Sequence, residues 1–362
     1  MKSRKKRDRG SLPLFKSNSS APHRIRMRES MRGTRRAVLL VLFLIVSLGA
    51  TALEIKIGSL APADTLWDAA LRQLARKWNE VTNGEVDMKI YGAGIAGDEA
   101  DMLRKVRLGQ LHGAALSGTG INRISSDTLV LSLPLLFDGY NELQYVLEHM
   151  SPTFEALIEE KGFKLAAWTT VGFVHFFGQK PIVTVDDLRG LKIAVSAEDE
   201  EILHSWRSSG FDALPLHTTE ILAGLQTGMA QAYHAPPIIA AVYQWFALSP
   251  YMSSLDIAPL VAGLIINERT WRRIPSRYHE DLIETSKEIL TDLYDSTLEL
   301  EEQAIEVMLA NGLVINEVPE SAMDDWYNLM QKGYDILVGT AISPEIFEET
   351  VRYRDEYRAM NE

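Results

Sequence analysis

Residues 86–116 read VDMKIYGAGIAGDEADMLRKVRLGQLHGAAL, and this stretch shows the pattern from which the fold can be predicted. The apolar segments 86–91 and 111–116 predict two strands. The segment 98–108 between them predicts a helix, because acidic residues occupy its first turn and basic residues its last. Strands that alternate with helices are typical of an α/β fold with a largely parallel sheet.

The same alternation continues on both sides of this stretch. A helix is expected over 65–81, where apolar residues recur at a spacing of four from Leu66 to Trp78. Beyond Pro275 the pattern is helical almost to the end, with an interruption over 313–318. About 310 residues exceed one comfortable core, so two lobes joined by crossing segments are expected. Further strands are expected over 54–59, 164–168, 191–195, 213–216, 230–233 and 261–266.

Composition and charge exclude several classes of protein. The 362 residues include no cysteine, which excludes disulfide frameworks, thiolate metal sites and cysteine nucleophiles. Residues 1–36 hold 13 Lys and Arg against 2 acidic residues, whereas the rest of the chain holds 24 against 47. Such an acidic body repels phosphate groups, so no nucleic-acid partner is expected.

An export signal is predicted over residues 1–52. The basic extension is followed by the apolar run AVLLVLFLIVSLG at 37–49 and then by the small residues Ala50, Thr51 and Ala52. This order is typical of a secretory signal, and the apolar run is short of the roughly 20 residues that span a membrane. The mature protein is then expected to begin at Leu53 and to be periplasmic. If the signal is not cleaved, the protein is anchored to the membrane instead.

A glycine-rich turn offers a rival interpretation. Gly92, Gly94 and Gly97 form a G-x-G-x-x-G pattern after a predicted strand and before a predicted helix, as in dinucleotide-binding sites. Asp98, Glu99 and the nearby Asp101 would place negative charge where the phosphates of the dinucleotide lie. The pattern is therefore interpreted as a tight turn, and no cofactor is expected.

The residue types needed for catalysis or metal binding are not gathered in any recognised motif. The eight histidines include no two within five residues of each other, so no metal site is predicted. No nucleophile elbow and no phosphate-binding P-loop occurs. The acidic run 198–201 is interpreted as a solvated first helical turn. These patterns favour a binding protein over an enzyme.

Several strings, taken together, resemble one family: the solute-binding subunits of tripartite ATP-independent periplasmic (TRAP) transporters, the DctP-type proteins. The strings occur in the family's order over nearly all of 53–362. They are YGAGIAGDE at 91–99, VRLGQ at 106–110, LPLLF at 133–137, VDDLRGLKI at 185–193, LQTG at 225–228 and the tryptophan at 271.

The resemblance implies a fold, a function and partners. Two α/β lobes would surround a ligand cleft, with a long helix near the carboxyl end linking them. The first lobe would span 53–171 and the second 172–259, each receiving part of 260–362. The protein would carry a small-molecule ligand to TRAP membrane permease subunits. Some systems of this type work with a periplasmic tetratricopeptide protein, which is a further candidate partner. The alternative function is a sensory or partner-docking binding module.

Three positions depart from the family pattern. Family members that bind organic acids carry an arginine after the G-L-K-I string, where this chain has Ala194. A second family arginine corresponds to Val174, and the family's asparagine before a proline corresponds to Ala235. Burying a carboxylate without a partner costs several kcal/mol, so these changes should abolish organic-acid binding.

The resemblance places mostly apolar and aromatic residues in the cleft, which predicts an apolar or amphipathic ligand. The alternative is an organic-acid ligand held by a substitute cation, for which His175, His217 and His234 are candidates. The expected ligand-binding residues are Trp67, Ser117, Trp168, Phe173, Val174, Ala194, Tyr233, His234, Ala235 and Pro236.

Overall fold

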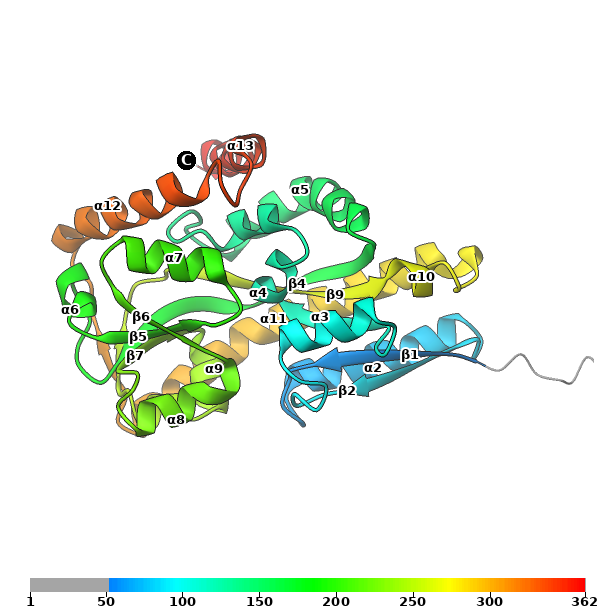
Figure 1. The fold of residues 1–362 in the computed structure, drawn as a ribbon, viewed down its shortest axis with the longest axis horizontal. Coiled ribbons are helices and arrows are strands. Elements are labelled where there is room, and N and C mark those ends of the chain that lie inside the picture. The colour runs from blue at the N-terminus through cyan, green and yellow to red at the C-terminus, as the bar shows by residue number, and fades with distance from the viewer. Residues whose placement is uncertain (1–51, 362) are drawn as a thin grey trace, which may run out of the picture. The chain divides into compact units, whose positions relative to one another are not determined.

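A ten-stranded sheet runs through residues 52–361, the part of the chain that the computed structural model describes (Figure 1). The predicted export signal lies almost wholly outside these residues. Each strand expected from the sequence is present. The strands are β1 (Leu53–Ser59), β2 (Val86–Tyr91), β3 (Gly113–Ser117), β4 (Phe163–Gly178), β5 (Lys192–Ser196), β6 (Asp212–Leu216), β7 (Ala232–Ala235), β8 (Tyr251–Ser253), β9 (Ala258–Asn267) and β10 (Val314–Asn316).

The main path of the sheet has the order β2-β1-β3-β9-β4-β7-β5-β6. Strands β1 to β3 pair in parallel at one end, and β5 to β7 pair in parallel at the other. Between these two halves, β9 is antiparallel to both β3 and β4, and β4 is antiparallel to β7. The expectation of a largely parallel sheet was therefore wrong for the centre, where two long strands cross between the halves.

Strand β4 is much longer than the segment 164–168 predicted for it. Nearly all of its second half is buried, so the sequence lacks the alternation that marks a half-exposed strand. Its pairing with β9 shifts register between Thr170 and Gly172. Gly172 has φ 136°, and a Cβ there would lie 2.8 Å from Pro236 Cβ, so the strand needs glycine at this point. The predicted lobe boundary at 171/172 falls on this irregularity.

Two predicted helices are confirmed, and the structure shows how each is capped. Helix α2 (Leu66–Val81) begins after Thr65, whose hydroxyl accepts from the Asp68 N–H. Helix α3 (Glu99–Arg107) begins after Asp98, whose Oδ1 accepts from the Asp101 N–H at 2.7 Å. The other helices before residue 279 are α4 (Gly118–Asn122), α5 (Tyr140–Glu160), α6 (Val185–Arg189), α7 (Glu200–Ser208), α8 (Ile221–Gln226), α9 (Pro237–Val242) and α10 (Glu268–Trp271).

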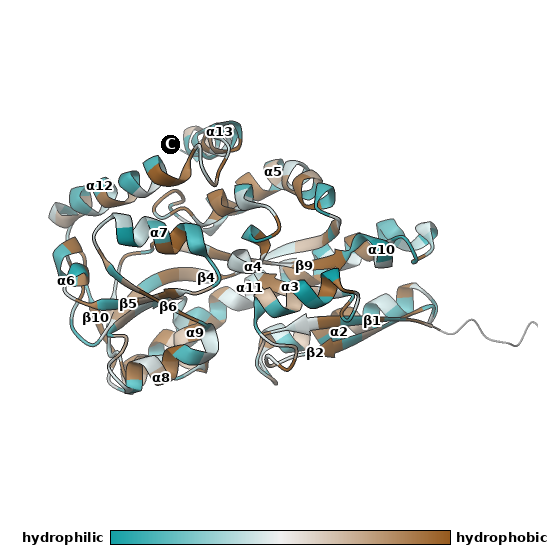
Figure 2. Ribbon diagram, viewed as in Figure 1, coloured by the Kyte–Doolittle hydropathy of each residue, from teal (hydrophilic) through white to brown (hydrophobic). Residues whose placement is uncertain are grey.

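The carboxyl-terminal region is helical, as predicted, and consists mainly of α11 (His279–Ala310), α12 (Glu320–Leu337) and α13 (Pro344–Asn361). Helix α11 packs on α2 and β4 and reaches α9, so it contacts elements on both sides of the crossing strands. Helix α13 packs on α5. Helices at the surface, such as α12, carry both hydrophobic and hydrophilic residues, as expected for helices that cover a sheet (Figure 2). Among residues 52–361, no helix has the length and apolar character to cross a membrane.

Candidate functional site

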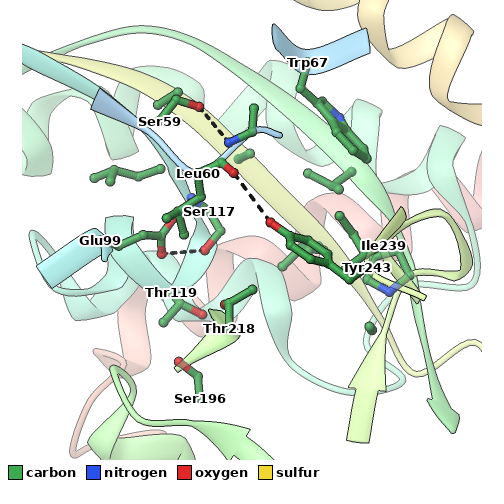
Figure 3. Close-up of a pocket in the computed structure, with 18 of the residues that line it drawn as sticks. Ser59, Leu60, Trp67, Glu99, Ser117, Thr119, Ser196, Thr218, Ile239 and Tyr243 are labelled. Carbon is green, nitrogen blue, oxygen red and sulfur yellow. Dashed lines mark hydrogen bonds between the residues drawn. The ribbon is translucent and has the colours of Figure 1, made fainter. Parts of the chain in front are cut away.

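A pocket of about 280 Å³ lies between the two parallel halves of the sheet (Figure 3). The loop after β1, helix α2 and strand β3 line one side, and β5, β7 and helix α9 line the other. The crossing strands β4 and β9 contribute Val174 and Leu260, and helix α11 contributes Leu290 and Leu293. The carboxyl ends of β1, β3, β5 and β7 therefore meet here, which is where α/β sheets bind ligands.

Seven of the ten predicted ligand-binding residues line this pocket: Trp67, Ser117, Val174, Ala194, His234, Ala235 and Pro236. The other three pack in neighbouring cores. Trp168 meets Phe154 edge to face, and Phe173 lies edge-on to Tyr140 at 4.7 Å between ring centroids. Tyr233 stacks on Phe177 at 5.0 Å. Phe173 and Tyr233 thus pack in hydrophobic clusters next to the pocket, although their chain neighbours Val174 and His234 line it.

Several lining residues were not predicted from the sequence. Most of them are apolar, such as Leu60 and Ile239, and the polar ones are Ser59, Glu99, Thr119, Thr169, Ser196, Glu198, Thr218 and Tyr243. The strand ends at Ser59 and Ser196 could have indicated two of them. The remaining polar residues lie on helices or loops, except Thr169 within β4, and carry no local signal. The interpretation of 198–201 as a solvated turn was wrong for its first half, because Glu198 and Asp199 are 6% and 7% exposed.

Glu99 joins two helices at the pocket wall. Its Oε1 accepts from the Ser117 N–H at 2.5 Å and its Oε2 from the Ser117 hydroxyl at 2.8 Å, so the carboxyl group stands at the start of α4. A Cβ at position 120 would lie 2.9 Å from Oε2, which explains the glycine there. Burial raises the pKa of Glu99 to about 7, although the hydrogen bonds from Ser117 oppose the shift and nearby Glu198 adds to it.

The raised pKa of Glu99 predicts a pH-dependent stability. The folded protein binds the Glu99 proton more tightly than the unfolded chain does. The protonated carboxyl group therefore contributes fully to the free energy of unfolding below about pH 4.5, and this contribution is lost as the pH rises through about 7. The loss is about 3 kcal/mol by the usual conversion of a pKa shift. Glu99→Gln should remove this part of the pH dependence of stability. Urea unfolding of both proteins at pH 4.5 and pH 8, with Glu160→Gln as a surface control, measures the difference. Parallel pH profiles for wild type and Glu99→Gln would contradict this assignment.

The pocket offers no cationic side chain, since its lining contains neither lysine nor arginine among the described residues. His234 is the one histidine in the lining, and burial lowers its pKa to about 4, which leaves the ring neutral at pH 7. His175 lies outside the lining, with Nδ1 3.1 Å from the Ser253 carbonyl and Nε2 3.0 Å from Asp256 Oδ1. Neither of these two histidines therefore resembles a substitute for the missing arginines. The third candidate, His217, lies outside the lining, near Asp98 and Glu198.

The glycine-rich turn has a structural role at the pocket. The Ala93 N–H donates to the Ala61 carbonyl at 2.9 Å, and the Gly94 N–H donates to the Ser59 carbonyl at 3.1 Å. These donors, which a pyrophosphate would need, thus hold the pocket-lining loop after β1. Residues 93, 94 and 97 all have positive φ, as a tight turn requires. The geometry favours the interpretation of this motif as a turn.

A cluster of three metal-ligating residue types lies beside the pocket. Asp98 precedes α3, Glu198 follows β5 and His217 follows β6, and one donor atom of each lies within 4.8 Å of the others. His217 Nδ1 is 3.4 Å from Glu198 Oε1 and 3.6 Å from Asp98 Oδ2. No sequence pattern indicates this cluster, because its members come from opposite halves of the sheet.

Comparison with known proteins gives a consistent result. Residues 57–339 match the sequence profile of the DctP family, described as bacterial extracellular solute-binding protein, family 7. One relative is the C4-dicarboxylate-binding periplasmic protein DctP of Rhodobacter capsulatus. It is 23% identical over 272 residues, which cover 74% of this chain and 80% of the relative.

Solved structures share the two-lobed α/β fold. A TRAP periplasmic solute-binding protein from Desulfovibrio salexigens, with bound orotic acid, superposes with a TM-score of 0.78 at 20% identity, covering 85% of this chain and 99% of that chain. Another, from Xanthobacter autotrophicus with bound β-D-galacturonate, gives 0.77 at 19% identity, covering 83% and 99%. The fold predicted from the sequence is confirmed.

Proposed function

Since this chain belongs to the family 7 bacterial extracellular solute-binding proteins, we propose that it binds a small apolar or amphipathic solute and delivers it to a TRAP-type permease. The family consists of solute-binding proteins that are periplasmic and work with membrane permease subunits. Binding without catalysis is proposed for this chain too. Its two lobes would close on the solute from the two halves of the sheet.

The main support for a neutral solute is the charge of the residues that line the pocket. Ala194, Val174 and Ala235 all line it, at the three positions where the family resemblance places polar anchors. Within the described part of the chain, the acidic residues that line the pocket are Glu99 and Glu198. A solute carboxylate would enter a desolvated site without a cationic partner and beside two acids, at a cost of several kcal/mol. A neutral solute avoids this cost.

Two unpartnered polar atoms favour an amphipathic solute over a purely apolar one. Trp67 Nε1 and His234 Nδ1 are buried at the pocket, and neither has a hydrogen-bond partner within residues 52–361. Buried polar atoms are nearly always hydrogen-bonded in native proteins. A solute with an acceptor near Trp67 and a polar group near His234 would satisfy both, while its apolar part contacts Leu260, Leu290 and Leu293.

An organic-acid ligand is the second candidate. The observation in its favour is that the relative from Rhodobacter is named for C4-dicarboxylates and both solved neighbours hold an acid. Those proteins are 19–23% identical to this chain, so their ligands do not transfer directly. A sensory role without transport is a further alternative, and the presence of a multi-span permease gene beside this gene would separate the two. The tetratricopeptide partner finds no support in these comparisons and stays a prediction.

A thermal-shift panel tests the ligand class. Neutral and amphipathic molecules, including long-chain and aromatic ones, are compared with succinate, galacturonate, orotate and sialic acid. A ligand at about 100 times its Kd adds about 2.7 kcal/mol of stability, which raises the Tm by roughly 5 °C. We expect such a shift from a member of the first set and none from the acids. Strong stabilisation by an acid alone would favour the second candidate.

A further inference from the structure

The cluster of Asp98, Glu198 and His217 joins residues that stand next to α3, β5 and β6, on both sides of the pocket. Asp98 uses Oδ1 to cap α3, which leaves Oδ2 directed at His217. The Glu198 backbone is held by the Ser196 hydroxyl on its own side and by Arg123 Nη1, which donates to its carbonyl at 2.5 Å from the other side. The His217 N–H donates to Glu220 Oε2 at 3.0 Å.

One oxygen of the Glu198 carboxylate lacks a hydrogen-bond partner among the described residues. Its side chain is 7% exposed, and its Oε1 lies 3.4 Å from the histidine nitrogen. Its Oε2 is buried and has no hydrogen-bond partner among the described residues. Burial and the nearby charge of Asp98 raise the pKa of Glu198, although hydrogen bonds from His217 and from the Glu99 backbone oppose the shift. A cation at this point would relieve both effects.

The distances in the cluster suit a tetrahedral metal ion. Zn²⁺ binds imidazole nitrogen and carboxylate oxygen at about 2.0–2.2 Å, which places the donor atoms of a tetrahedral site roughly 3.3–3.6 Å apart. The histidine nitrogen is 3.4 Å and 3.6 Å from the two carboxylate oxygens. Three protein ligands leave a fourth position for water.

We propose that Asp98, Glu198 and His217 bind a divalent first-row metal ion, of which Zn²⁺ fits the donor set and spacing, and that this ion joins the two halves of the sheet beside the pocket. Imidazole with two carboxylates is a donor set of first-row metals rather than of Ca²⁺ or Mg²⁺, which take oxygen ligands. One ligand comes from the β1–β3 half and two come from the β5–β7 half, so the ion stabilises their approach.

Calorimetric titration of the untagged, chelator-treated full chain with ZnCl₂ tests this proposal without any solute, and its outcome is independent of the ligand class. The wild type should bind one Zn²⁺ with a saturable heat. Asp98→Asn, Glu198→Gln and His217→Gln should each weaken binding at least tenfold, since even outer-shell changes at metal sites weaken binding by about 10–100-fold. Asparagine retains the helix cap, so Asp98→Asn should fold normally.

His204→Gln serves as the matched control, because His204 is an exposed histidine on α7 outside the cluster. It should bind Zn²⁺ as the wild type does, and Zn²⁺ should raise the Tm of both but not that of His217→Gln. Far-UV circular dichroism confirms that each variant is folded. Absence of a saturable heat in the wild type, or unchanged binding in both Asp98→Asn and His217→Gln, would overturn the proposal and leave a hydrogen-bonded histidine between two acids.

Discussion

Ala194→Arg is expected to reduce the affinity for an apolar or amphipathic solute at least 100-fold. Ala194 is 3% exposed in β5 and lines the pocket, so a longer side chain at this position must enter the space that the solute would occupy. If the guanidinium has no partner, burying it costs several kcal/mol, and about 2.7 kcal/mol already corresponds to 100-fold. If it pairs with Glu198, the pair still fills the pocket of about 280 Å³.

Calorimetry with a solute that stabilises the wild type measures this loss. Ala194→Met is the control, because it adds a side chain of similar length without charge and should weaken binding less than the arginine does. Ala194→Arg is also expected to gain weak affinity for a short carboxylate, since a guanidinium can donate two parallel hydrogen bonds to it. Wild-type affinity in the arginine variant would show that position 194 lies outside the binding site.

Trp326→Ala is expected to lower the free energy of unfolding by about 3–5 kcal/mol, the usual range for removing a buried tryptophan. Trp326 on α12 is fully buried, and its ring stacks on Phe176 of β4 with centroids 5.5 Å apart. Its Nε1 donates to the Val183 carbonyl at 3.0 Å, so truncation leaves both a cavity and an unpaired carbonyl. This residue fixes the carboxyl-terminal region on the β5–β7 half of the sheet.

Equilibrium urea unfolding measures the effect, and Tyr327→Ala provides the comparison on the same helix. Tyr327 is 50% exposed, and its loss should change the free energy of unfolding by less than about 0.5 kcal/mol. Similar changes in both variants would mean that α12 is not anchored through Trp326.

Local patterns in the sequence were sufficient to predict most of the secondary structure. Helix α2 follows from apolar spacing, and helix α3 follows from the acidic residues in its first turn and the basic residues in its last. Strand direction could not be predicted in the same way, because it depends on pairing between segments far apart in the sequence. Strand β9, for example, pairs antiparallel with β3 and β4, which come much earlier in the chain. The second half of β4 was missed because burial of both faces removes the alternation of polar and apolar residues.

Pocket residues were predicted at the positions that the family resemblance places in the cleft. Residues that reach the pocket only through long-range contacts were missed. Ala194, Val174 and Ala235 line the pocket from three different strands, β5, β4 and β7. Glu99 was read as one of several acids in a first helical turn, and only the fold brings it to Ser117. Glu198 meets Asp98 only when the two halves of the sheet come together, so no local pattern could reveal it.

Mass spectrometry of the solute that copurifies with the native protein tests the central claim most directly. The protein is purified from the periplasm without added ligand, denatured, and the released small molecules are compared with those from Ala194→Arg prepared in the same way. The account predicts a neutral, apolar or amphipathic molecule in stoichiometric amount with the wild type and its loss from the variant. A stoichiometric dicarboxylate or sugar acid released from the wild type would contradict it.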